Sequence, residues 1–195
     1  MPWFWFLVGL VGFLGLHTVR IVAPRWREAR IATMGEKPWK GIYSLLSIAF
    51  FVLMIWGYGQ IRQHPVLVWQ PPMVLRHVGM LLVVIAFVLI VAAYVPNNAI
   101  RARLGHPMIL GAKTWAFAHL LMSGWLHSMV LFGAFLLWAI VGFSSMRKRP
   151  QDTVAKSSMA MTIVTVVAGI IFAGVFAMFL HGMLIGVRPI NMPMH

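Results

Sequence analysis

Cysteine is absent from this chain and acidic residues are scarce, since its 195 residues include no Cys and only 3 Asp+Glu. A chain without thiols forms no disulfide, zinc–thiolate site, iron–sulfur cluster or thiol nucleophile. The carboxylates of Glu28, Glu36 and Asp152 lie in or near basic loops and not inside apolar segments. We therefore do not expect a carboxylate proton relay, a two-carboxylate hydrolase or a hard-cation cage.

Charge of either sign is also uncommon, and apolar residues take its place. Charged residues make up 10% of the chain and hydrophobic residues 61%, with a mean hydropathy of +0.87. A soluble domain of this length cannot bury so much apolar surface, so the composition predicts an integral membrane protein. The first apolar run has no basic residue before it and no small-residue cleavage site, so we do not expect a cleaved signal peptide.

Long apolar runs separated by helix breakers predict an all-α polytopic bundle of six transmembrane helices. The breakers include Pro96-Asn97-Asn98 after the third run and Pro107 at the start of the fourth. The fourth and fifth helices are expected to form a tight hairpin, and the whole chain, residues 1–195, is read as one transmembrane domain without an internal repeat. The expected spans are Trp3–Val22, Gly41–Gly59, Met73–Val95, Pro107–Gly124, Trp125–Phe143 and Ser158–Val187, with a basic loop from Arg25 to Lys40 and a polar loop from Gln60 to Pro72.

Basic residues are distributed unevenly between the two sides of this expected bundle. With six spans, 13 of the 16 Lys+Arg lie in the loops Arg20–Lys40, Arg101–Lys113 and Arg147–Lys156. The positive-inside rule places these loops in the cytoplasm and both termini on the other side of the membrane. Because the basic residues flank apolar helices, anionic lipid head groups are the expected partner, and nucleic acid is not.

Two histidines interrupt apolar segments, His17 in GFLGLHTVR and His119 in TWAFAHLLMSG. An ionisable side chain in hydrocarbon is costly, so its default interpretation is functional. His17 lies three residues inside Arg20 and His119 six residues inside Lys113, which predicts similar depths in the cytoplasmic half of the bilayer. Two neutral imidazoles at one depth could ligate a metal, above all a haem iron. The alternatives are a hydrogen bond from His17 to a neighbouring helix and ordinary small-residue packing around His119.

Aromatic and basic residues accompany both histidines at helical spacing. Phe13 and Arg20 share a helical face with His17, and Trp115 lies one turn from His119. We expect Phe13 and Trp115 to line a haem and Arg20 to stabilise its propionates. The alternative for Arg20 is that it snorkels to a lipid phosphate.

His106 and Lys113 accompany the expected start of the fourth helix. Unpaired backbone N–H groups at a helix start, together with His106 and Lys113, form a small anion site. Such a site suits a haem propionate, a lipid phosphate or a substrate carboxylate. The alternative is a capping histidine and an interfacial lysine.

The remaining histidines are expected at or near the outer face of the membrane. His77 and His181 together form the candidate for a second metal site, against the alternative that both are solvated. The segment around Met192, Met194 and His195 is a candidate for loose copper binding, against the alternative of a frayed tail. His64 and His127 complete the set on this side.

Several of these segments resemble the NnrU family of bacterial membrane proteins. The resemblance extends from about residue 10 to about residue 140, and the early LGLHTVR and the run GHPMILGAKTWAFAHLL are its most specific parts. The other segments are APRWR, MGEKPWKGIYSLLS, IWGYGQIR, AAYVPNNAIRARL and the GW–LFGAFLLWA hairpin. The resemblance implies a bacterial inner-membrane protein linked to denitrification and nitric oxide metabolism.

The NnrU family is in turn similar to plant ζ-carotene isomerase, a membrane enzyme with a b-type haem. That similarity implies an iron held by two histidines, matched here by His17 in GLHTV and His119 in WAFAH, and a redox-dependent cis–trans isomerisation. Nitric oxide or a hydrophobic polyene would then be the ligand. The sequence departs from the isomerase pattern in reading GHP where that pattern has RHP, at His106 and Pro107.

Two other classes of function compete with the haem protein. One is a haem-free transporter or assembly factor for nitrogen-oxide respiration. The other is a membrane methyltransferase, since HP-x-x-x-G also resembles the motif with which such enzymes bind S-adenosylmethionine. The paired downstream glutamates of those enzymes have no counterpart, because only Asp152 follows Glu36. Haem absorbance, S-adenosylmethionine binding or neither would separate the three classes.

Overall fold

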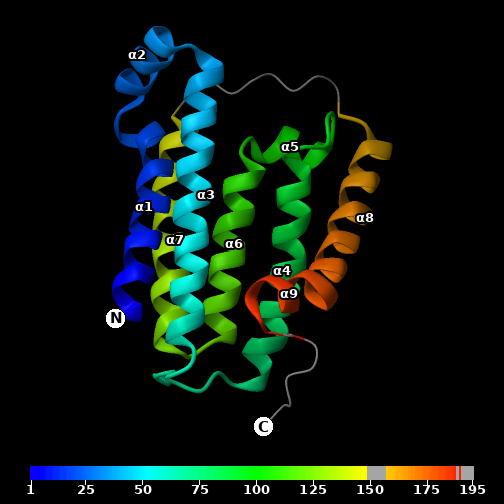
Figure 1. The fold of residues 1–195 in the computed structure, drawn as a ribbon. Coiled ribbons are helices and arrows are strands. Elements are labelled where there is room, and N and C mark those ends of the chain that lie inside the picture. Colours follow the sequence, from blue (N-terminus) through cyan, green and yellow to red (C-terminus); the bar gives the residue numbers. More distant parts are fainter. Residues whose placement is uncertain (149–156, 188, 190–195) are drawn as a thin grey trace. The chain divides into compact units, whose positions relative to one another are not determined.

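The structure, a computed structural model, describes residues 1–148, 157–187 and 189 as two compact units, Met1–Val66 (unit 1) and Leu67–His195 (unit 2). Within the described residues the only β-type pairing is an isolated bridge between Leu67 and Trp125. The prediction of an all-α protein is confirmed (Figure 1). The elements are α1 (Pro2–Val22), α2 (Pro24–Met34), α3 (Glu36–Ile61), α4 (Met73–Ala92), α5 (Ala99–Leu104), α6 (Pro107–Met122), α7 (Leu126–Arg147), α8 (Met159–Val175), the π-helix η1 (Phe176–Leu180) and α9 (His181–Ile185).

Five helical stretches are long and apolar enough to cross a membrane. They are α1, α3, α4, α7 and the continuous run Met159–Ile185 formed by α8, η1 and α9. The remaining expected span is α6, which has 16 residues. At 1.5 Å per residue α6 is about 24 Å long, against about 30 Å for a bilayer's hydrocarbon core. The fold therefore supports a multi-pass bundle with five candidate spans.

Two expected segments differ from the structure in their local conformation. The stretch Arg25–Lys40, expected as a loop, contains α2 and the first turn of α3. Gly35 separates these helices with a φ of 85°, which a side chain would disfavour, so the chain turns there instead of continuing as one helix. The last expected span is not uniform, because its α-helical hydrogen bonding changes to π-type bonding at Phe176.

Unit 1 is a hairpin of α1 and α3 that packs through glycine. A Cβ at Gly57 of α3 would lie 2.6 Å from the backbone nitrogen of Phe6, and a Cβ at Gly9 of α1 would overlap the backbone of Met54. Neither helix can hold a larger residue at these positions without moving. Small residues of this kind let membrane helices approach closely enough for backbone-to-backbone packing.

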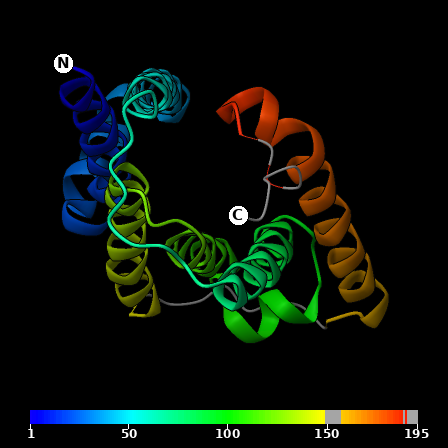
Figure 2. The same cartoon turned by 90° about the horizontal axis from the view of Figure 1, so that it is seen from below.

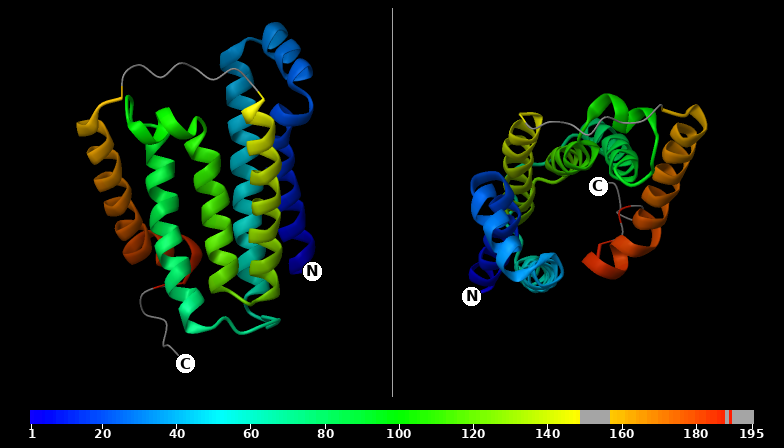
Figure 3. Two further views of the ribbon diagram at one scale, coloured as in Figure 1. Left: turned by 180° about the vertical axis from the view of Figure 1, so that it is seen from behind. Right: turned by 90° about the horizontal axis from the view of Figure 1, so that it is seen from above.

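Unit 2 is built around α4, which lies between α6 and α8. The bottom view in Figure 2 and the top view in Figure 3 both show α7, α6, α4 and α8 in a curved row. Glycines again mark the contacts: Gly111 of α6 faces the carbonyl of Ala86, and Gly169 of α8 faces the backbone of Val88. The tight hairpin expected between the fourth and fifth helices is confirmed, since only Ser123–Trp125 separate α6 from α7.

A buried asparagine hydrogen-bonds the backbone of the connection between α4 and α5. The Nδ2 of Asn98 donates to the carbonyls of Ala92 (2.9 Å) and Val95 (2.6 Å), and its Oδ1 accepts from the backbone N–H of Arg101 (2.8 Å). Asn98 is fully buried. The next residue continues the connection to α8, because the N–H of Ala99 donates to Oγ1 of Thr162.

We predict that Gly57→Ala destabilises unit 1, by roughly 1–3 kcal/mol, as overpacking of a close contact does. The added methyl group would meet the backbone of Phe6, which cannot rotate away. The measurement is thermal unfolding of the purified protein in detergent. Gly59→Ala, also on α3, is the matched control, because nothing lies within 4 Å of a Cβ there. Equal unfolding temperatures for the two variants would contradict the proposed packing.

Replacement of Asn98 by Ala is expected to lower the free energy of unfolding by about 1–3 kcal/mol, because it leaves buried carbonyl and N–H groups without partners. The same denaturation assay measures the loss. Asn97→Gly serves as the control, since Asn97 is exposed and has a φ of 54°, which glycine adopts readily. An unchanged free energy of unfolding in Asn98→Ala would show that the hydrogen bonds of Asn98 contribute little to stability.

Candidate functional site

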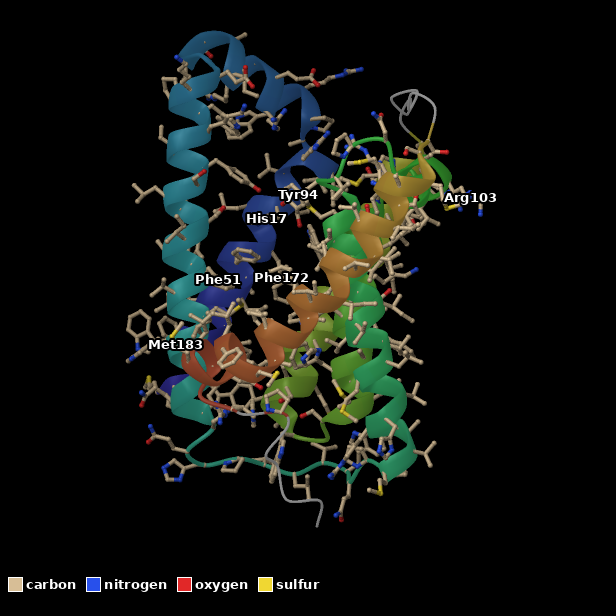
Figure 4. All side chains as sticks on the ribbon, turned by 90° about the vertical axis from the view of Figure 1, so that its right-hand side faces the viewer. His17, Phe51, Tyr94, Arg103, Phe172 and Met183 are labelled. Atoms are coloured by element: carbon tan, nitrogen blue, oxygen red, sulfur yellow. The ribbon has the colours of Figure 1, made fainter. Side chains whose placement is uncertain are left out.

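His17 lies on α1 of unit 1, near the end of the helix. Its Nδ1 donates a hydrogen bond to the carbonyl oxygen of Phe13, one turn earlier, over 2.8 Å. Its ring packs against Phe13 with centroids 4.3 Å apart and against Tyr43 of α3 at 5.5 Å. Figure 4 shows His17 on α1 and Phe51 on the neighbouring α3, where Phe51 contacts Phe13 at 5.7 Å. Phe13 therefore contacts His17 as expected, and Tyr43 and Phe51 of α3 extend this aromatic group within unit 1.

His119 lies on α6 of unit 2 and has the same local arrangement. Its Nδ1 donates to the carbonyl oxygen of Trp115 over 2.8 Å. The imidazole stacks on Phe132 of α7 with centroids 4.4 Å apart and a 27° interplanar angle. Trp115 lies 5.1 Å from the imidazole and also contacts Phe132. Phe132 is a neighbour that sequence spacing on one helix could not identify, because it comes from the next helix.

Both hydrogen bonds determine which ring nitrogen carries the proton. A backbone carbonyl only accepts, so Nδ1 of His17 and Nδ1 of His119 are the protonated nitrogens. In the neutral ring the lone pair is then on Nε2. Metal-binding histidines usually have this arrangement, in which the other ring N–H is held by a carbonyl or carboxylate.

The cations expected beside the histidines have different surroundings. Arg20 is exposed, one turn beyond His17 on α1. Lys113 lies six residues after the start of α6, about 9 Å along the helix. His119 is consequently only three residues from the end of α6 at Met122.

Lys113 belongs to a basic cluster at one end of α6 and α7. Its Nζ lies 5.4 Å from the ring centroid of Phe143, and the guanidinium of Arg147 lies 5.9 Å from the same ring. The Nε2 of His106 donates to the carbonyl of Met146 over 3.1 Å. His106 precedes α6 but makes no side-chain cap bond to it. These contacts place Lys113, Arg147 and His106 beside the last turns of α7.

The other histidines lie in different environments. His64 and His77 are exposed. His127 is 3% exposed and stacks beside Trp125. The candidate copper segment of Met192, Met194 and His195 lies outside the described residues.

His181, a candidate ligand of the second metal site, has a local geometry that the sequence did not reveal. Its Nδ1 donates to the carbonyl of Val187 over 2.7 Å, and Phe176 lies edge-on to its ring at 6.0 Å. Across the residues that the structure describes, no group of three or more His, Asp or Glu side chains is arranged to hold a metal ion.

Apolar side chains cover the outward faces of the helices. Leu45 (69% exposed), Leu81 (63%) and Leu137 (66%) are examples from α3, α4 and α7. Soluble monomeric proteins rarely expose apolar surfaces of this extent, whereas a helix in the hydrocarbon core of a bilayer exposes them at no cost. Together with the five candidate spans, this surface defines a multi-pass helical membrane protein.

Within that class, the chain belongs to the NnrU family. The family model described as NnrU protein matches residues 5–189, which include parts of both units. No curated protein and no solved structure matches the chain. The resemblance noted in the sequence is thereby confirmed at the level of the family.

Proposed function

We propose that this NnrU-family protein is a b-type haem protein of the bacterial inner membrane, with His17 and His119 as axial ligands of the iron. The observation that carries the proposal is the shared geometry of the two imidazoles. Each donates from Nδ1 to the carbonyl four residues earlier, over 2.8 Å, and so directs the lone pair of the neutral ring to Nε2. Two histidines in apolar helices with this same tautomer are a donor set suited to haem iron.

The surroundings of each histidine support the same function. Phe13 and Tyr43 pack against His17, and Trp115 and Phe132 pack against His119. Aromatic contacts restrict the orientation of each imidazole and exclude water, which preorganises a ligand. Arg20 follows His17 by one turn and serves as a propionate partner.

The cluster of Lys113, His106 and Arg147 is the second candidate for holding propionates. A bound haem would supply a redox-active iron that takes up one electron or binds a small ligand. We infer a role in nitrogen-oxide metabolism or in redox-dependent isomerisation of a polyene double bond, both in accordance with the family resemblance. The protein residues provide imidazole ligation, a water-poor aromatic environment and positive charge.

We predict that the purified protein shows a Soret band and, after reduction with dithionite, sharp α and β bands of six-coordinate b-haem. His17→Ala and His119→Ala should each weaken haem binding by about tenfold or more, or convert the iron to high spin, because an axial nitrogen is lost. Absorption spectra and the haem-to-protein ratio are the measurements.

His64→Ala is the control for these variants, since His64 is exposed in a connecting segment. It should leave the spectrum unchanged. A colourless wild-type protein, purified from cells with ample haem, would contradict the proposal and favour the transport or assembly function.

We further propose that α6 completes a six-span topology with both termini outside the cytoplasm. α6 packs between α4 and α7 within unit 2, so protein instead of lipid covers much of its length. A helix of 16 residues can cross in such a position because local thinning of the bilayer and flanking polar segments accommodate a short span. The basic loops then all face the cytoplasm, as the positive-inside rule requires.

Single cysteines introduced into this cysteine-free chain can test the topology. With six spans, Thr33→Cys and Ser157→Cys are on the same side of the membrane and Gln63→Cys is on the other. All three residues are exposed. A membrane-impermeant maleimide added to intact cells should therefore label only Gln63→Cys. If α6 does not cross the membrane, residues 33 and 157 lie on opposite sides. The reagent will then label only one of Thr33→Cys and Ser157→Cys.

A further inference from the structure

A short helix that the sequence did not predict joins the two long helices of unit 1. α2 follows α1 after Ala23 alone and precedes α3 after Gly35 alone, so each corner is a single residue. Figure 1 shows α2 at the end of the hairpin that α1 and α3 form. None of its 11 residues is buried. Packing in a core therefore does not account for the position of α2 or for its basic composition.

The register of the hairpin leaves α3 longer than α1 at the end where α2 lies. Gly57 of α3 faces Phe6 of α1, and each is four residues from the end of its helix, Ile61 and Pro2. The two helices therefore end together on that side. Because α3 has 26 residues and α1 has 21, the first turn of α3 projects beyond α1 on the side of α2.

This projection has the thickness of the headgroup layer of a bilayer. α1 is about 31 Å long and α3 about 39 Å, so the difference is about 8 Å of helix. A hydrocarbon core is about 30 Å thick, and the headgroup layers add about 5–8 Å on each side. An α1 that spans the core therefore leaves the first turn of α3 among the headgroups. α2 connects these two levels and lies in the same layer.

Aromatic contacts hold α2 beside the projecting turn of α3. The rings of Trp26 in α2 and Trp39 in α3 meet edge-on with centroids 5.8 Å apart, and Trp26 remains 49% exposed. The guanidinium of Arg30 lies 5.5 Å from the centroid of the Trp26 ring. Tryptophan is typical of the membrane interface, where its apolar ring and its polar N–H both find suitable surroundings. These contacts agree with the level that the helix lengths indicate.

The charged residues of α2 lie on two different faces of the helix. Arg25 and Glu28 are three residues apart, so they are neighbours of opposite charge. Arg27 and Arg30 have the same spacing and lie on the face that includes Trp26. Two like charges at this spacing destabilise a helix. One face of α2 is thus balanced in charge, and the other has two adjacent cations.

The second carboxylate of unit 1 does not balance this pair of cations. Unit 1 has no acidic residue besides Glu28 and Glu36. Glu36 is bonded to Lys40 over 2.7 Å. Within the described part of the chain, Arg27 and Arg30 therefore have no carboxylate partner in an ion pair. An anion from outside the protein can occupy the space between them.

We propose that Arg27 and Arg30 bind the phosphate of an anionic phospholipid, with the indole of Trp26 beside it. Guanidinium groups suit phosphate because each donates two parallel N–H bonds to its oxygens. One phosphate between the two arginines replaces their repulsion with two attractions. The level of α2 among the headgroups favours a lipid over a soluble anion. The inference goes beyond the proposed function, in which these two arginines have no part.

The test uses the full-length protein in phosphatidylcholine bilayers, with a fluorophore on Thr33→Cys as the one thiol of the chain. Thr33 is exposed and lies one turn after Arg30 on α2. Phosphatidylglycerol with a nitroxide next to its headgroup is added in increasing mole fraction, and quenching reports lipid bound at this face. Phosphatidylcholine with the same nitroxide is the reference. Half-quenching should require at least about fivefold less phosphatidylglycerol than phosphatidylcholine, because each arginine near an anionic headgroup contributes about that factor.

Three charge variants of the labelled protein locate the site. Arg27→Gln and Arg30→Gln should each raise the mole fraction of phosphatidylglycerol at half-quenching by about fivefold. Arg25→Gln is the matched control, because it removes the same charge from the same helix but from the face that includes Glu28. It should leave the quenching curve unchanged. An equal loss in all three variants would show general attraction by surface charge and would overturn the site.

A second labelling position controls for ordinary contact with lipid. Gly15 of α1 is exposed, and nothing lies within 4 Å of a Cβ there. A fluorophore on Gly15→Cys should be quenched equally by the two lipids, because no cation is placed beside it on the apolar part of α1. A preference for phosphatidylglycerol at both positions would mean that the lipid is enriched around the whole protein, against a site on α2.

The remaining outcomes are equally decisive. Equal quenching of the Thr33→Cys label by both lipids would overturn the inference. A label that neither lipid quenches would overturn it too, since α2 would then project into water, where an acidic protein segment would suit its arginines. None of these measurements involves haem. A protein that binds no haem can therefore still show the lipid site, and failure of either proposal is recognised separately.

Discussion

Close approach of helices at glycine is the physical constraint on which the other features of this protein depend. Lipid tails are as apolar as leucine, so membrane helices gain little from hydrophobic burial and associate through short-range packing. Gly9 and Gly57 provide this contact in unit 1, and Gly79, Gly111 and Gly169 provide it along α4. Each contact fixes the register of two helices as well as their distance, because the neighbouring backbone occupies the space of a side chain.

The register determines which side chains can act together, whereas local hydrogen bonds determine their chemistry. In both His17 and His119 the proton is held on Nδ1 by a carbonyl of the same helix, so each tautomer is set within a single turn. The level of His119 along α4 is set instead by a contact between helices, that of Gly79 with the carbonyl of Ala118. A variant that shifts these helices would alter the site without changing any histidine.

Polar groups add a second constraint where the helices end. Asn98 satisfies the carbonyls left at the end of α4, and Thr162 accepts from the backbone immediately after it. This fixes the beginning of α8, and Gly169 fixes its middle against Val88. The π-helical segment η1 then precedes His181, whose ring contacts Phe176 and the carbonyl of Val187.

The sequence by itself determined the membrane class, most of the helix bounds and the aromatic neighbours on the same helix, Phe13 beside His17 and Trp115 beside His119. Composition, apolar run length and spacing within one helix are local properties, and they do not depend on tertiary contacts. It did not predict α2, because helix ends in basic segments depend on backbone turns such as Gly35. Only the tertiary structure placed Phe132 on His119, because contacts between helices depend on register, which residue spacing along one helix does not encode.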